Sequence, residues 1–100
     1  PPPMTELSAA DAAVRQARAA EAQTYAPVEL RFAEDKLSRA RSAADAEEYT
    51  LAIELAAQAQ VDGELAEAKS LAARARAEVR QKTEENARMS RELLGEGERP

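Results

Sequence analysis

The feature that most constrains this chain is a long stretch, from Ala46 to Leu94, that contains no proline and only one glycine, Gly63. As a single α-helix this stretch would extend about 70 Å, at about 1.5 Å per residue. A helix of that length is far longer than a compact domain of 100 residues requires. The sequence therefore predicts an elongated molecule.

The hydrophobic residues of the chain are mostly alanine, which supplies 25 of the 44. An alanine side chain buries little apolar surface, so the core is thin and the fold depends on helix propensity and close helix packing. Alanine-rich composition with many Glu and Arg residues is typical of long helices and coiled coils. We predict an all-α fold, an antiparallel helical hairpin or three-helix bundle with a long, coiled-coil-like third helix.

Local signals divide the chain into an extended lead (residues 1–7), one helical domain (8–94) and a flexible tail (95–100). Within the domain we expect helices at about 8–24, 27–44 and 46–94. Ser8 and Asp11 are spaced as a weak capping box, and Pro27 suits the first position of the second helix. Asp45 and Glu48 have the same capping-box spacing and indicate the start of the third helix.

Two glycines bear on the long helix. The Asp62-Gly63 pair often marks a turn, but no loop residues flank it and one glycine costs a helix only about 1 kcal/mol. We therefore favour a continuous helix through Gly63. Gly95 is expected to end that helix.

Composition excludes several classes of function. The net charge of −5 disfavours binding to nucleic acid, which requires a basic face. The chain has no Cys and no His, so thiol chemistry, zinc sites of the usual kind and imidazole catalysis are absent. We predict no enzymatic activity, no catalytic residues, no cofactor site and no metal site. No apolar run is long enough to span a membrane.

Apolar and small residues recur at alternating spacings of three and four residues in the second half of the long helix, as in a coiled coil. We predict that this seam mediates self-association, so that the protein is a homo-oligomer. Its main candidate residues are Leu65, Ala72, Val79, Asn86, Met89 and Leu93.

A groove between the second and third helices is the alternative interaction site. Its candidate residues are Phe32, Tyr49 and Ile53. With such a groove the protein would be a peptide- or protein-binding adaptor similar to a tetratricopeptide unit, whose helix junction the segment 44–59 resembles. Tyr25, Pro27 and Asp45 are interpreted as structural residues of the helix junctions.

Two segments carry a family resemblance. The first is Tyr25-Ala26-Pro27-Val28-Glu29-Leu30, followed by Ala33, Lys36-Leu37 and Ala40. The second is Glu48-Tyr49-x-x-Ala52-x-x-Leu55-Ala56-x-Gln58-Ala59, followed by Asp62, Leu65-Ala66 and Ala68-Lys69. Together they resemble the bacterial envelope family called domain of unknown function 4398 (DUF4398), over roughly residues 8–77.

The resemblance implies a helical module of the periplasm or an outer-membrane lipoprotein of a Gram-negative bacterium. It implies a lipid anchor upstream of Pro1, and envelope proteins or an OmpA-like, peptidoglycan-associated protein as partners. It provides no catalytic residues. The expected function is that of a non-enzymatic spacer or scaffold of the cell envelope.

Overall fold

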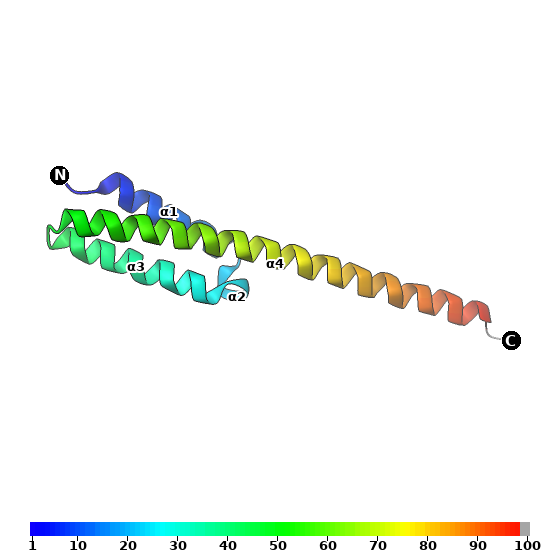
Figure 1. Ribbon diagram of the computed structural model, residues 1–100. Helices are drawn as coiled ribbons and strands as arrows, with labels where there is room; N and C mark the ends of the chain where they lie inside the picture. The colour runs from blue at the N-terminus through cyan, green and yellow to red at the C-terminus, as the bar shows by residue number, and fades with distance from the viewer. Residues whose placement is uncertain (99–100) are drawn as a thin grey trace.

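The computed structural model describes residues 1–98, and over this range the chain forms four α-helices (Figure 1). These are α1 (Met4–Ala19), α2 (Ala22–Tyr25), α3 (Pro27–Asp45) and α4 (Tyr49–Glu98). The predicted all-α, elongated fold is confirmed. The molecule measures 80 × 18 × 13 Å, and its radius of gyration is 21.5 Å, whereas a compact domain of this size has about 13 Å.

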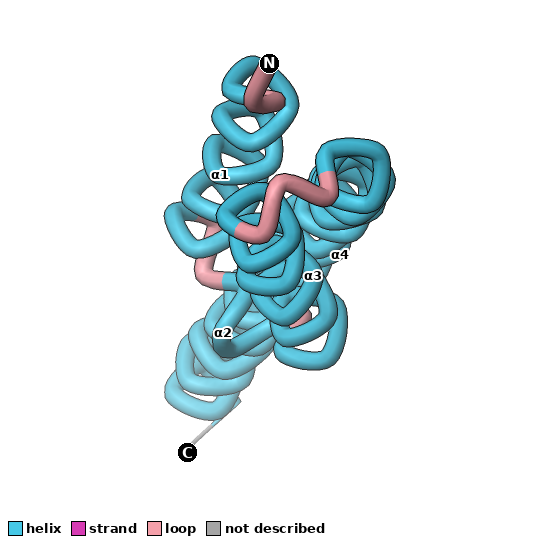
Figure 2. Tube along the Cα trace, turned by 90° about the vertical axis from the view of Figure 1, so that its left-hand side faces the viewer, coloured by secondary structure: helices cyan, strands magenta, loops and turns pink. Residues whose placement is uncertain are grey.

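The first half of α4 is the centre of a small bundle, with α1 and α3 packed beside it (Figure 2). Arg41 pairs with Asp11 and Arg18 with Glu34, so α1 and α3 run antiparallel. We call α1, α2, α3 and residues 49–74 the body, and residues 75–95 of α4 the arm. The arm continues the axis of α4 away from the body (Figure 1).

Alanine dominates the core of the body. Among the described residues, the larger buried hydrophobic side chains are Val14, Leu30, Leu37 and Leu55. The buried alanines lie at 10, 13, 17, 20, 22, 26, 33, 40, 43, 52, 56, 59 and 66. Small side chains let helix backbones approach closely, and this approach replaces the usual packing of large side chains.

The first helix differs from the prediction at both ends. It begins at Met4 and not near Ser8, because Met4 and Leu7 donate backbone hydrogen bonds to the carbonyls of Pro2 and Pro3. Prolines suit this position, since the first helical turn needs no N–H from them. The predicted extended lead therefore covers only residues 1–3.

The same helix ends at Ala19, and the predicted continuous helix to 24 is wrong. Glu21 adopts the left-handed conformation with φ of 66° and donates its backbone N–H to Arg18 O at 2.9 Å. The chain then forms the short helix α2 before Pro27 begins α3 as predicted. A helix commonly ends on such a left-handed residue, although glycine is the usual choice.

The turn between α3 and α4 also differs from the prediction. Asp45 is the last residue of α3 and does not cap α4. Glu47 is left-handed, with φ of 63°; its N–H donates to Ala44 O at 3.0 Å and the Glu48 N–H donates to Ala43 O at 2.8 Å. This pattern is a Schellman motif, which closes α3, so α4 begins at residue 49 and not at 46.

Gly63 lies within continuous helix, as predicted. Gly95 does not end α4, which continues to Glu98. The predicted flexible tail at 95–100 is therefore helical through Glu98, and its last two residues lie outside the described range. In the part of the chain that the structure describes, no helix combines the length and the apolar character needed to cross a membrane.

Candidate interaction surface on the long helix

The seam of α4 faces away from the body. Gly63 and Ser70 are buried against the body. Leu65 lies two positions after Gly63, and Ala72 lies two positions after Ser70. Two positions turn an α-helix by about 200°, so the seam lies on the side of α4 opposite its buried face. The body therefore leaves this side of the helix uncovered.

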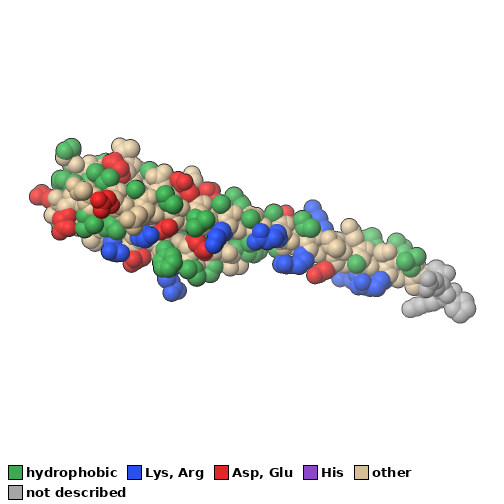
Figure 3. Space-filling view, viewed as in Figure 1, with side chains coloured by type: hydrophobic (Ala, Val, Ile, Leu, Met, Phe, Trp, Pro, Cys, Tyr) green, Lys and Arg blue, Asp and Glu red, His purple; other side chains and the backbone are tan. Residues whose placement is uncertain are grey.

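All six predicted seam residues are exposed on α4. The large side chains of the arm are the most open: Val79 is 65 % exposed, Met89 58 % and Leu93 65 %. Figure 3 shows hydrophobic side chains exposed along the arm, with Lys and Arg side chains between them. The structure thus places the seam residues in a row on one helix.

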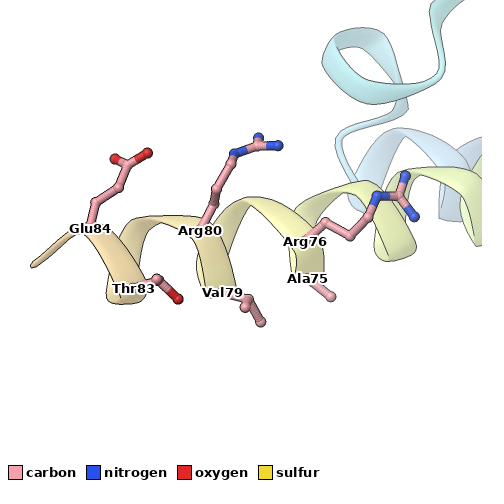
Figure 4. A pocket seen from close by; sticks show the side chains of 6 residues that line it. All are labelled: Ala75, Arg76, Val79, Arg80, Thr83 and Glu84. Atoms are coloured by element: carbon pink, nitrogen blue, oxygen red, sulfur yellow. The ribbon is translucent and has the colours of Figure 1, made fainter. Parts of the chain in front are cut away.

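The region around Val79 is a shallow, largely apolar surface formed by a single helix (Figure 4). Ala75, Val79 and Thr83 project to one side, while Arg76 and Arg80 project to another (Figure 4). Because every residue that lines this surface comes from α4, no second wall encloses a ligand. Such a surface suits a partner helix better than a small molecule.

The structure does not bring the three groove residues together. Lys36 pairs with Asp62 and Glu29 with Lys69, so α3 and α4 run antiparallel and Phe32 lies level with residue 66. Ile53 is 13 positions away along α4, or about 20 Å. Phe32 is 55 % exposed, Ile53 is 43 % exposed and Tyr49 is half-buried.

The predicted junction residues occupy the ends of helices. Tyr25 is the last residue of α2 and is partly exposed, at the connection to α3. Pro27 is the first residue of α3, where its missing N–H costs no hydrogen bond. Asp45 is exposed at the end of α3. Of these three, Pro27 has the role that its residue type predicts most directly.

Ion pairs between helices fix the position of α4 in the body. Lys36 Nζ lies 2.6 Å from Asp62 Oδ2, and Arg74 Nε lies 3.0 Å from Glu21 Oε2. Arg74 thus binds the residue whose left-handed backbone ends α1, at the border between body and arm.

A third pair joins α3 to α4. Lys69 Nζ donates a hydrogen bond to Glu29 Oε2 at 2.5 Å. This hydrogen bond, with one from the Glu29 backbone N–H, lowers the pKa of Glu29 below its ordinary value. The pair lies at the same end of the body as the Arg74–Glu21 pair.

Sequence reasoning did not predict two contacts that α4 makes with the end and the middle of α1, at Ser70 and Gly63. Ser70 is fully buried, and its hydroxyl donates a hydrogen bond to the carbonyl oxygen of Ala20, where α1 ends. Gly63 contacts the backbone of Ala13. A signal for Ser70 was available: it lies seven positions after Gly63, on the face that carries Ala52, Ala56 and Ala59.

Where the structure describes side chains, no group of three Asp or Glu residues is placed to hold a metal ion. Several acidic residues of the body instead pair with Lys or Arg residues of other helices, namely Asp11, Glu21, Glu29, Glu34 and Asp62. The arrangement is that of a structural interface.

Comparison with known proteins agrees with the helical pattern. The profile of one protein family, described as "Domain of unknown function (DUF4398)", matches residues 5–82. Comparisons with curated proteins and with solved structures find no match. The family match covers both segments that carry the resemblance, and it ends within the arm. The chain therefore belongs to the DUF4398 family.

Proposed function

We propose that this protein is a non-enzymatic structural module, a rod-shaped spacer that assembles with further copies of itself through the seam of α4. The observation that supports this proposal is that the arm projects beyond the body with its seam side uncovered. It extends α4 beyond the body by about 30 Å, at about 1.5 Å per residue over its 21 positions. It carries Val79, Met89 and Leu93 uncovered on the seam side.

The arm is a single helix that extends away from the body (Figure 1). A single helix in water is marginally stable, and most helices in proteins are held by packing of their apolar face. Residues 78–94 of the arm are all exposed, and the ion pair between Arg74 and Glu21 lies at the border of the body, before the arm begins. Packing against a second helix removes the exposed apolar side chains from water and stabilises the arm.

We place this role in the bacterial cell envelope, in the periplasm or at the outer membrane. This part of the proposal is supported by the two sequence segments that resemble the envelope family. A rigid rod suits such a location because it fixes the distance between structures bound to its two ends. Candidate partners there are envelope proteins, including an OmpA-like protein that binds peptidoglycan.

Sedimentation velocity over a series of protein concentrations tests the assembly. Val79→Asp places a charge in the seam, while Gln81→Asp introduces the same residue two positions later on the opposite side of α4. We expect the native chain and Gln81→Asp to associate as concentration rises, and Val79→Asp to stay monomeric while its body still unfolds cooperatively on heating. A native chain that is monomeric at every concentration would overturn the proposal.

A further inference from the structure

We infer that the second copy binds the seam in parallel orientation, with the two α4 helices side by side in register and both bodies at the same end. This inference rests on the proposed self-association and adds its geometry. It is carried by the charges on the two sides of the seam and by the polar residue within it.

The seam follows a heptad pattern that assigns each residue a position. The first core position is occupied by Leu65, Ala72, Val79, Asn86 and Leu93, and the second core position by Ala68, Ala75, Lys82 and Met89. Both rows lie on the exposed side of α4. The alanine layers let two helices approach to the short end of the usual range of 8–10 Å.

The two flanks of the seam differ in charge. One flank, which we call the acidic flank, consists of Glu64, Leu71, Glu78, Glu85 and Glu92. The opposite flank consists of Lys69, Arg76, Thr83 and Ser90 and carries no acidic residue. In a two-stranded coiled coil, residues at these flanking positions meet across the interface and determine the orientation of the partner.

An antiparallel pair brings each flank against the same flank of the other copy. Its acidic flanks would then place glutamates such as Glu78 and Glu85 opposite one another in every register that the heptads allow. Like charges placed together in this way disfavour a pairing. A parallel pair instead brings the acidic flank of one copy against the opposite flank of the other, so that glutamates face Thr83, Ser90 or a basic residue.

Asn86 supports the same orientation. In a parallel pair in register, the two Asn86 side chains lie in one layer and can hydrogen-bond to each other. A single asparagine at the first core position specifies register and a two-stranded state, at a cost in stability. In an antiparallel pair each Asn86 faces a residue of the other core row, and the amide has no matching partner.

Lys82 interrupts the apolar seam in both orientations. Its stem is long enough to carry the ammonium group out of the interface. Glu78 lies one turn before it on the same helix, which is the favourable order for an ion pair. In a parallel pair in register the two Lys82 side chains share a layer, so their like charges weaken this orientation. The charges of the two flanks and Asn86 favour it against this cost.

Disulfide cross-linking tests the orientation, because the chain contains no cysteine of its own. Ala72→Cys and Leu93→Cys are each introduced alone, at two first core positions that lie about 32 Å apart along α4. Residues that share a core layer of a parallel pair are close enough for a disulfide, which needs a Cα–Cα distance of about 4.4–6.8 Å. Glu84→Cys, on the side of the helix opposite the seam, is the control.

We expect each of the two seam variants to form a covalent dimer on mild oxidation by itself, and Glu84→Cys to form none. Failure of both seam variants alone, with cross-linking only to a cysteine in the other core row, as in a mixture of Ala72→Cys and Met89→Cys, would show an antiparallel pair and overturn this inference. If no combination cross-links, sedimentation velocity of the native chain separates two outcomes. A native chain that is dimeric refutes the parallel seam but leaves self-association standing. A native chain that is monomeric refutes the proposed self-association as well.

Discussion

Gly63 of α4 lies directly against Ala13 of α1. A Cβ atom built on Gly63 would be 3.0 Å from both the carbonyl carbon and the Cβ atom of Ala13. Gly63 therefore lets α1 pack directly against the backbone of α4, and α4 stays helical at this position. This close approach is where the first helix joins the long helix.

Gly63→Ala tests this contact. Alanine favours a helix over glycine by about 1 kcal/mol, but an overfilled contact costs about 1–3 kcal/mol, so we expect a net loss of up to about 2 kcal/mol. Gly95→Ala is the matched control, since its added Cβ would meet no atom within 4 Å apart from its chain neighbours and the backbone of its own helix turn. Chemical denaturation measures both, and a Gly63→Ala protein stabilised as much as Gly95→Ala would contradict the close approach.

The buried hydroxyl of Ser70 provides a second test. Ser70→Ala removes the hydrogen bond to the carbonyl of Ala20, and the expected cost is about 1–3 kcal/mol because that carbonyl loses its buried donor. Ser90→Ala removes an exposed hydroxyl of the same helix and should leave the free energy of unfolding almost unchanged. Equal stability of the two variants would show that the Ser70 hydrogen bond contributes nothing.

The alanine interface makes a third prediction. Ala56 is fully buried between the helices, and Ala57 beside it is exposed. Ala56→Leu should destabilise the body by about 1–3 kcal/mol, because the added carbons force the helices apart. Ala57→Leu adds the same atoms at the surface and should change stability by less than about 0.5 kcal/mol. Thermal unfolding of the two variants gives the comparison, and an Ala56→Leu protein as stable as Ala57→Leu would mean that the helices are not closely packed.

The pair of Glu29 and Lys69 predicts a dependence on pH. Its hydrogen bond lowers the pKa of Glu29 in the folded protein, so the pair contributes stability above the pKa of glutamate in an unfolded chain, about 4.3. That contribution is lost as the pH falls through the lower folded value. Glu29→Gln should therefore lose less stability than the native protein between neutral pH and the acid range.

Denaturation at a series of pH values, with Glu54→Gln as an exposed control, measures the effect of Glu29→Gln. Parallel stability curves for Glu29→Gln and the native protein would refute the contribution of the pair. Titration of Glu29 by NMR gives an independent measure of the direction of its shift.

The sequence pattern was sufficient to predict the apolar faces of the helices. Leu30, Ala33, Leu37 and Ala40 have the spacing of one helix face, and all four are buried in α3. Periodicity succeeds here because each helix of the body has one face against a neighbour. The same reasoning predicted that the end of α4 outruns the helices beside it.

The helix ends were harder to predict. Glu21 and Glu47 both adopt the left-handed conformation, which is usually marked by glycine. Nothing in the type of these residues signals it, since the conformation is held by hydrogen bonds to Arg18 and Ala44 and, at Glu21, by the ion pair with Arg74. Contacts between distant parts of the chain decided these positions.

The groove residues show the second limit of sequence reasoning. Phe32 and Ile53 are large and apolar, which favours a buried position in most proteins. In this fold alanine takes most of the buried positions, and Phe32 and Ile53 lie on the exposed sides of their helices. The type of a residue alone does not predict its burial when the interface is built from alanine.

Small-angle scattering of the Val79→Asp variant is the most direct test of the central claim, that α4 is one continuous rod extending beyond the body. With association suppressed, the account predicts a monomer with a radius of gyration close to 21.5 Å and a longest dimension near 80 Å. A monomer with a radius of gyration of about 13 Å, as for a compact domain of this length, would contradict it.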